Sequence, residues 1–200
     1  QLEHARGHLE ALLAAAPTLV EARVLHARLE SATGNARRAL DLLRGLPREA
    51  MTSHIARLVD RTEVEVEVRA AIRRWYAGDR AGSRQALLRI RKGRSLEPVA
   101  LGAVAEGYSE IGMHDRAMET LQEAIAIEER PRPGLLLQLA GVLLRAERYV
   151  DLAELLRQLE STPLDSGRAR RDLVAVRVAF AVRIADAARE AGRHVRAFDA

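Results

Sequence analysis

The chain of 200 residues contains no cysteine and few aromatic residues. The lack of cysteine excludes disulfides, thiolate metal sites and a cysteine nucleophile. Aromatic side chains make up only 3% of the residues, which argues against a β-sandwich or barrel, where they are enriched. No apolar run reaches the roughly 18 residues of a membrane-spanning helix, so this fragment is not expected to insert directly into a membrane. The abundant Ala, Leu, Arg and Glu favour helices, and the composition predicts an all-α fold.

Lysine is also nearly absent, because Lys92 is the only one among 32 basic side chains. The 28 acidic side chains leave a formal net charge of +4. Each arginine cluster has Glu or Asp nearby, and the clusters are not interleaved with aromatic residues. These features disfavour a nucleic-acid partner. The preference for arginine indicates a coding bias rather than an adaptation to phosphate.

Catalytic and metal-binding motifs are missing as well. The sequence has no Gly-rich phosphate loop, no G-x-S-x-G and no H-E-x-x-H. His4 and His8 lie four residues apart on one expected helix, but no third ligand lies at an obvious spacing. We therefore expect no enzymatic activity, no metal site and no cofactor.

An internal repeat dominates the sequence. Each copy has an apolar helix, a short turn and a second helix that opens with a small residue. The turns are centred on Gly34, Gly78, Gly112, Glu147 and Gly192, and the small residues are Ala5, Ala39, Ser83, Ala117, Ala153 and Ala197. Spacings of 34 residues recur, and two spacings of 44 residues indicate units with a ten-residue extension. Because glycine adopts the left-handed conformation at helix ends at little cost, Glu147 is expected to use another turn geometry, with one extra residue before Ala153.

The two extensions are predicted to lengthen the first helix of their units. Residues 51–77 contain neither Pro nor Gly and have apolar residues at helical spacing. The alternation of Glu and Val over residues 63–68 could indicate a strand instead, but the repeat favours a helix. Residues 168–191 likewise predict one long helix. Between these regions, residues 161–167 form either a hinge or a capped connection into the long helix.

The most regular segment, residues 101–131, resembles the tetratricopeptide repeat (TPR) family. The matching residues are Leu101, Val104, Ala105, Tyr108, Gly112, Ala117, Leu121, Ala124 and Pro131. The resemblance implies a right-handed TPR superhelix, an α/α solenoid, with two lengthened first helices. We expect a partial unit at 1–17, with a helix over 2–15, and units of about 18–47, 48–95, 96–131, 132–160 and 166–200. Both ends cut through a unit, so we expect a fragment of a longer array.

In TPR proteins the inner face of each first helix lines a concave groove that holds a partner. The resemblance implies the following groove residues here: Arg28, Trp75, Tyr76, Glu106, Ser109, Glu110, Arg145, Asp186 and Arg189. Trp75 and Tyr76 have side chains typical of interface anchors, although Trp75 alternatively packs inside the lengthened helix pair. Arg28 is the only residue that matches the carboxylate clamp of chaperone adaptors, which disfavours that role.

Three segments, residues 75–91, 135–159 and 172–200, resemble the periplasmic repeats of the cellulose synthase operon protein C family. This resemblance implies a non-catalytic periplasmic scaffold for the synthesis and export of cellulose or another exopolysaccharide. Its expected partners are proteins, namely the synthase complex, the outer-membrane channel or cell-wall components, with glucan as a further ligand. The alternative is a cytoplasmic TPR adaptor or sensor module of a regulatory protein.

Overall fold

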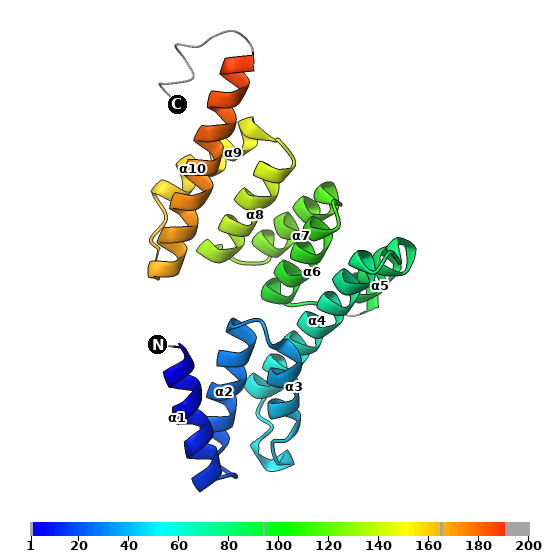
Figure 1. The fold of residues 1–200 in the computed structure, drawn as a ribbon, viewed down its shortest axis with the longest axis vertical. Coiled ribbons are helices and arrows are strands. Elements are labelled where there is room, and N and C mark those ends of the chain that lie inside the picture. Colours follow the sequence, from blue (N-terminus) through cyan, green and yellow to red (C-terminus); the bar gives the residue numbers. More distant parts are fainter. Residues whose placement is uncertain (1, 94, 165, 191–200) are drawn as a thin grey trace. The chain divides into compact units, whose positions relative to one another are not determined.

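A computed structural model describes residues 2–93, 95–164 and 166–190, and within these residues it contains helices and no strands (Figure 1). The α-helices are α1 (Leu2–Ala15), α2 (Val20–Ala32), α3 (Ala36–Arg44), α4 (Ser53–Tyr76), α5 (Arg80–Gly93), α6 (Pro98–Glu110), α7 (His114–Ala126), α8 (Pro133–Arg145), α9 (Tyr149–Glu160) and α10 (Gly167–Glu190). A short 3-10 helix, η1, covers Arg48–Ala50. The predicted all-α fold is confirmed. No helix among the described residues has both the length and the apolar character needed to cross a membrane.

The chain divides into two compact units, Gln1–Val104 and Ala105–Ala200, and the boundary falls within α6. In the first unit, α1 packs on α2, α2 on α3, α3 on α4 and α4 on α5. In the second unit, α8 packs on α7, α9 and α10. Apart from the α8–α10 pair, which joins the first helices of two successive hairpins, these contacts join helices that are neighbours in the sequence, as expected for stacked helical hairpins.

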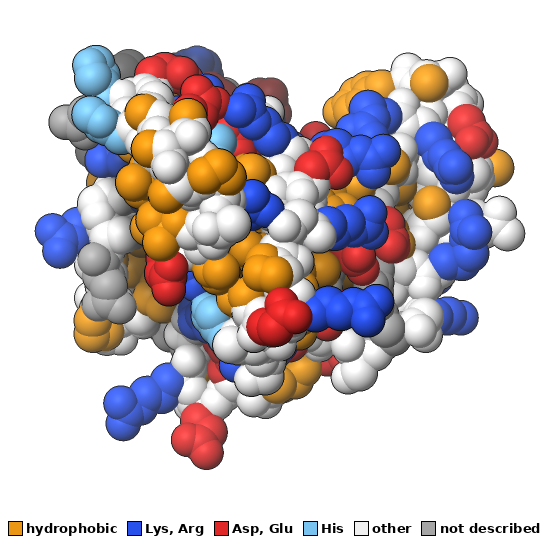
Figure 2. Space-filling view, turned by 90° about the horizontal axis from the view of Figure 1, so that it is seen from below, with side chains coloured by type: hydrophobic (Ala, Val, Ile, Leu, Met, Phe, Trp, Pro, Cys, Tyr) orange, Lys and Arg blue, Asp and Glu red, His pale blue; other side chains and the backbone are white. Residues whose placement is uncertain are grey.

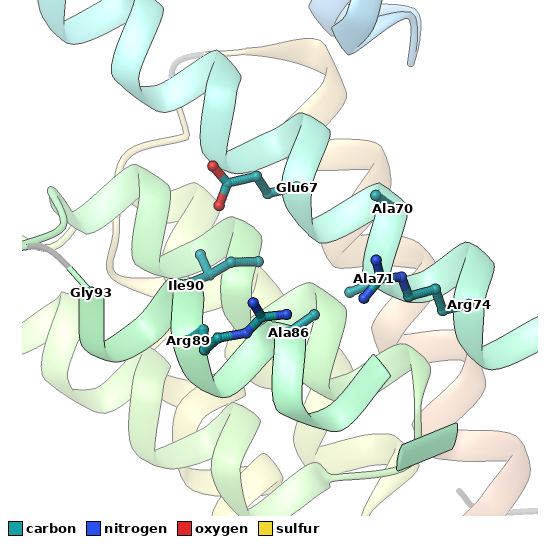
Figure 3. A pocket seen from close by; sticks show the side chains of 8 residues that line it. All are labelled: Glu67, Ala70, Ala71, Arg74, Ala86, Arg89, Ile90 and Gly93. Atoms are coloured by element: carbon teal, nitrogen blue, oxygen red, sulfur yellow. The ribbon is translucent and has the colours of Figure 1, made fainter. Parts of the chain in front are cut away.

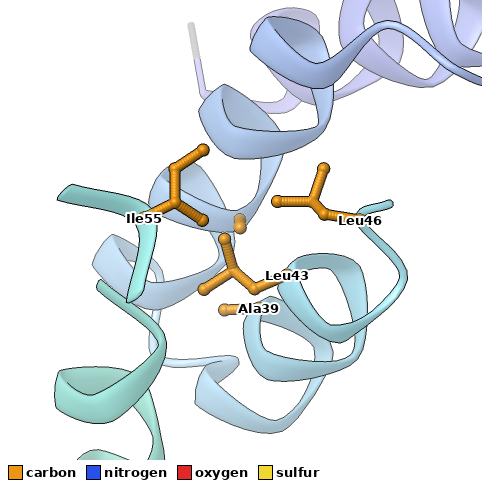
Figure 4. Packing of buried hydrophobic residues seen from close by; sticks show 5 residues of the cluster. Ala39, Leu43, Leu46 and Ile55 are labelled. Atoms are coloured by element: carbon orange, nitrogen blue, oxygen red, sulfur yellow. The ribbon is translucent and has the colours of Figure 1, made fainter. Parts of the chain in front are cut away.

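The core of the first unit lies where α2, α3 and the start of α4 meet (Figure 4). Ala27 and Ala39 are 1% and 0% exposed, and their small side chains let α2 and α3 approach closely. Leu43, Leu46 and Ile55 fill the space beside them. Burying a leucine or isoleucine side chain contributes roughly 1.5–3 kcal/mol, so this apolar contact stabilises the packing of three successive helices.

The glycine-centred turns have the predicted left-handed backbone, with φ of 93° at Gly34, 91° at Gly78 and 76° at Gly112. At α4–α5, the Gly78 N–H donates to the Trp75 carbonyl at 3.0 Å, and the Asp79 N–H donates to the Arg74 carbonyl at 2.9 Å. These two bonds satisfy carbonyl groups that the helix end would otherwise leave unpaired. The turn at Gly192 and the small residue Ala197 lie outside the described residues.

The turn at Glu147 departs from our expectation. Glu147 has a φ of 57°, and its N–H donates to the Leu144 carbonyl at 3.2 Å, while the Arg148 N–H donates to Leu143 at 2.9 Å. This is the same turn as at the glycines, so the prediction of another geometry is wrong. The hydrogen bonds and the packing of the helices on either side hold a non-glycine residue in an unfavourable conformation.

The predicted extra residue after this turn is also absent. Leu152 follows Glu147 by five residues, as Ala117 follows Gly112, and both Leu152 and Ala117 are 0% exposed. Ala153, which we expected at this position, is only half-buried. A leucine therefore occupies the α8–α9 contact at a position where other helix pairs hold alanine or serine.

Both lengthened helices are confirmed, since α4 and α10 each span 24 residues. In α4, Val64 and Val68 are 1% and 3% exposed. Four residues place two side chains on the same face of a helix, so the alternation that suggested a strand is compatible with burial on one helical face. The predicted helix over residues 2–15 is also confirmed by α1. Ala191, the expected end of the last helix, lies outside the described residues.

The connection between α9 and α10 contains a helix cap. The Ser166 side chain accepts a hydrogen bond from the Ala169 N–H at 3.1 Å, and Thr162 donates to the Gln158 carbonyl at 2.9 Å. These bonds support the capped connection that the sequence left open. The division of the chain into repeat units and a hinge at 161–167 stay predictions.

Candidate partner-binding groove

A groove of about 590 Å³ lies on the second unit, between α6, α8 and the beginning of α10. Its lining residues are Glu106, Glu110, Pro133, Gly134, Leu137, Gln138, Gly141, Val142, Arg145, Ser166, Arg168, Ala169 and Asp172. Three successive first helices of the predicted units supply nearly all of this surface. The groove therefore lies on the face on which the TPR resemblance implies partner binding.

Helical spacing explains how α8 forms the floor of the groove. Leu137, Gly141 and Arg145 are four residues apart and so lie on one face of the helix. A Cβ atom added at Gly134 or at Gly141 would meet no other atom within 4 Å. The two glycines therefore keep the floor open, while Leu137, which is 8% exposed, contributes little apolar surface to it.

The rim of the groove carries charges of both signs. Arg145 Nη1 lies 3.8 Å from Glu110 Oε1, and Arg168 Nε lies 3.8 Å from Asp172 Oδ2. Partly exposed pairs of this kind contribute only about 0–1 kcal/mol to stability, so a partner can replace them at little cost. Glu106 forms no ion pair within the described part of the chain, and its carboxylate is available to a basic group.

The structure brings three of the expected site residues together in this groove, namely Glu106, Glu110 and Arg145. Ser109 was expected on the same surface, but it is only 3% exposed. Its Oγ forms no hydrogen bond. Ser109 therefore lies beneath the surface and offers no group to a partner, because the single residue step from Ser109 to Glu110 turns the side-chain direction by about 100° around the helix.

Asp186 and Arg189 do not line the groove, although the repeat register aligned them with residues of α8. They lie near the end of α10 and pair with each other, with 3.4 Å between Arg189 Nη1 and Asp186 Oδ1. The beginning of α10 faces the groove instead, through Arg168 and Asp172. Sequence reasoning missed these two residues, although their four-residue spacing and opposite charges are visible in the sequence.

The other expected site residues belong to the first unit. Arg28 Nη2 lies 2.6 Å from His54 Nε2. Trp75 is half-buried, with the guanidinium carbons of Arg80 and Arg84 at 5.2 and 5.4 Å from its ring centroid. This stacking on α5 fits the packing alternative for Trp75, whereas Tyr76 is 71% exposed.

Comparison with known proteins gives two full-length matches to this chain. It is 33% identical over 202 residues to "Cellulose synthase operon protein C" of Xanthomonas axonopodis pv. citri (strain 306). It is 26% identical over 201 residues to the protein of that name in Pseudomonas fluorescens (strain SBW25). The chain is homologous to a segment of cellulose synthase operon protein C. The predicted resemblance to that family is thus confirmed.

These matches cover 99% and 100% of the chain but only 13% and 16% of the two relatives. The chain therefore spans only a small part of the length of these relatives. No protein-family model matches it. The paired helices and the glycine turns are consistent with a TPR-like region of that protein.

A buried polar cluster also joins the first three helices of this cellulose synthase operon protein C homologue. Glu30 is 0% exposed and accepts hydrogen bonds from Arg6 Nε at 2.9 Å and from Asn35 Nδ2 at 2.7 Å. His26 Nε2 lies 3.2 Å from the same carboxylate. Burial acts to raise the pKa of Glu30, but the hydrogen bonds from Asn35 and Arg6 outweigh it and hold the pKa below its usual value. An ionised, enclosed carboxylate of this kind links helices and has no access to a substrate.

The other polar side chains that the structure describes can be compared with the requirements of a metal site through their grouping. His4 and His8 are exposed on α1, and no group of three or more His, Asp or Glu residues suited to a metal occurs among the residues described. On the face shown in Figure 2, basic and acidic side chains are interspersed, with hydrophobic side chains between them.

Proposed function

We propose that this chain is a non-catalytic scaffold region that binds protein partners during the synthesis and export of bacterial cellulose or a related exopolysaccharide. The groove between α6, α8 and α10 carries the proposal, because it is open, has mixed charge and is formed by successive helices. The name shared by the two homologues points to cellulose synthesis. We propose the periplasm as its location, since a scaffold for export would act between the inner and the outer membrane.

A polypeptide fits the groove better than a sugar chain does. Sugar binding favours exposed aromatic platforms, and none of the residues that line the groove is aromatic. The lining instead combines half-buried apolar side chains, Pro133 and Ala169, with charged groups such as Glu106 and Arg145. Apolar contacts surrounded by polar groups are typical of protein interfaces. Glucan is therefore a secondary candidate.

The groove also lacks the arrangement of groups that a hydrolytic enzyme needs. Among the described residues that line it, Ser166 alone has a hydroxyl side chain and none is a histidine. The Ser166 oxygen accepts a hydrogen bond from the Ala169 N–H and so serves as a helix cap. Nucleophilic catalysis needs a base within hydrogen-bond reach of the nucleophile. Binding without chemistry is the function that this lining supports.

A co-purification experiment tests the proposal. The tagged chain would be produced together with the cellulose synthase complex and the outer-membrane channel, and the retained proteins identified. We expect Arg145→Glu to reduce retention of the partner, whereas Arg189→Glu, the same change outside the groove, leaves it intact. Equal retention by both variants, each with the helical circular dichroism of the wild type, would contradict the role of the groove.

The proposed location needs a separate test on the full-length protein. Protease added to intact spheroplasts should cleave this region if it lies in the periplasm. Protection until the inner membrane is lysed would place it in the cytoplasm, and would favour an adaptor or sensor module.

The choice between protein and glucan as the ligand needs a third test. In a titration of the isolated chain with soluble cello-oligosaccharides, saturable binding would favour glucan over protein.

A further inference from the structure

The first unit carries a cluster of positively charged residues that do not line the groove on the second unit. Residues 69–93 contain eight basic side chains and one acidic one, a formal charge of +7, compared with +4 for the whole chain. The single acid, Asp79, accepts a hydrogen bond from the Gly82 N–H at 2.8 Å at the start of α5. It therefore caps a helix. This segment forms the last third of α4 and all of α5.

The lengthening of α4 leaves a notch beside this charge. Contacts with α3 involve the earlier part of α4, for example between Arg44 and Glu63 at 2.8 Å. Beyond this part, α4 continues past α3 and pairs with α5 (Figure 1). A notch of about 530 Å³ lies between these two helices. Its lining residues are Glu67, Ala70, Ala71, Arg74, Ala86, Arg89, Ile90 and Gly93.

Two arginines approach the notch from opposite helices. Figure 3 shows the side chains of Arg74 on α4 and Arg89 on α5 extending toward each other across it. Within the described residues, neither guanidinium has a hydrogen bond or an ion pair. Glu67 lines the opposite end and is engaged in an interaction of its own. The small side chains of Ala70 and Ala86 leave room between the guanidiniums for another group.

We propose that this notch binds a carboxylate side chain from an acidic segment of a partner protein. A guanidinium offers several N–H donors in a planar fork, which matches the two oxygens of a carboxylate. Two such groups on opposite walls hold one carboxylate between them, and the surrounding positive charge attracts its neighbours in an acidic sequence. The two arginines reach into one notch, which suits the side chain of a protein, whereas a membrane surface would meet exposed arginines over a broad, flat area. This site is separate from the proposed groove on the second unit.

A fluorescein-labelled hexaglutamate peptide is the probe for the test, with binding followed by fluorescence anisotropy at low and at physiological salt. We expect saturable binding that the Arg74→Gln/Arg89→Gln variant weakens roughly tenfold, because two exposed ion pairs with the peptide are lost. Arg73→Gln/Lys92→Gln is the matched control, because it removes the same charge from exposed residues of the same segment that do not line the notch. It should weaken binding less than the notch variant does.

Several results would overturn the proposal. Equal weakening by the two double variants would show diffuse electrostatic attraction, and absence of peptide binding would show no site at all. Binding to phosphatidylglycerol vesicles that depends on Arg74 and Arg89, without peptide binding, would show a lipid surface instead.

Two further variants have expected results. Arg74→Lys/Arg89→Lys retains the charge without the planar fork, so we expect peptide binding intermediate between that of the wild type and that of the Gln variant. Arg145→Glu should leave peptide binding unchanged, which separates this test from that of the groove.

Discussion

Replacing Glu147 with glycine should stabilise the protein. Among the described non-glycine residues, Glu147 alone has a positive φ, at 57°, and its exposed side chain forms no hydrogen bond or ion pair there. The left-handed conformation costs an L-residue about 1–2 kcal/mol. The greater freedom of glycine in the unfolded chain offsets about 0.4–1 kcal/mol of this. We therefore expect Glu147→Gly to raise the free energy of unfolding by about 0.5–1 kcal/mol.

Urea and thermal unfolding followed by circular dichroism at 222 nm measure this change. A gain of this size raises Tm by about 1–4 °C in a chain of this length. Gly112→Ala is the reciprocal variant, because φ there is 76° and an added Cβ meets no atom within 4 Å. It should lose a similar amount of stability through the backbone alone. Glu147→Ala should change little. If Glu147→Ala stabilised the protein as much as Glu147→Gly, the backbone explanation would be refuted.

Three further substitutions test the interior. Ser83→Ala should stabilise the protein by about 1 kcal/mol in urea unfolding, because the buried Ser83 hydroxyl has no hydrogen bond; a loss of stability would mean that the hydroxyl is bonded. Leu152→Ala should cost about 2–5 kcal/mol, since Leu152 is 0% exposed, and a cost below about 1 kcal/mol would contradict its place in the core. Glu30→Gln should cost about 2–4 kcal/mol at neutral pH, because it removes the charge opposite Arg6. The folded pKa of Glu30 lies below its usual 4.5, so this stabilisation is complete above pH 4.5 and is lost as the pH falls through the folded pKa. The difference between wild type and Glu30→Gln should shrink below pH 4, and a constant difference down to pH 3 would contradict the assignment.

Most of the helices could be predicted from sequence because their ends carry local signals. Pro17 follows α1, and glycines follow α2, α4 and α6, so the turn residues mark the boundaries directly. Glu147 was misjudged because propensity is a weak prior that tertiary contacts override. Leu152 was missed for a related reason, because the repeat pattern predicts a small residue at this position, whereas the α8–α9 contact accommodates a large one.

The groove was partly predictable because the repeat places equivalent positions on one surface. Glu106, Glu110 and Arg145 follow from helical spacing within ordinary units. Asp186 and Arg189 did not, because a period does not say which half of a lengthened helix faces its neighbour. The Glu30 cluster could not be predicted from the sequence for a different reason. Arg6 is 24 residues away from its carboxylate partner, and nothing in the local sequence links the two.

The most direct test of the central claim measures the affinity of the immobilised chain for the purified cellulose synthase complex before and after the groove is filled. Gly141 lines the groove, and a Cβ added there meets no atom within 4 Å, so Gly141→Phe should fill the groove without disturbing the core. Gly7→Phe is the matched control on α1, where a Cβ is equally free of contacts. We predict binding by the wild type and Gly7→Phe, and at least a tenfold loss for Gly141→Phe, about 1.4 kcal/mol, with the fold intact. Unchanged affinity for Gly141→Phe would contradict the account.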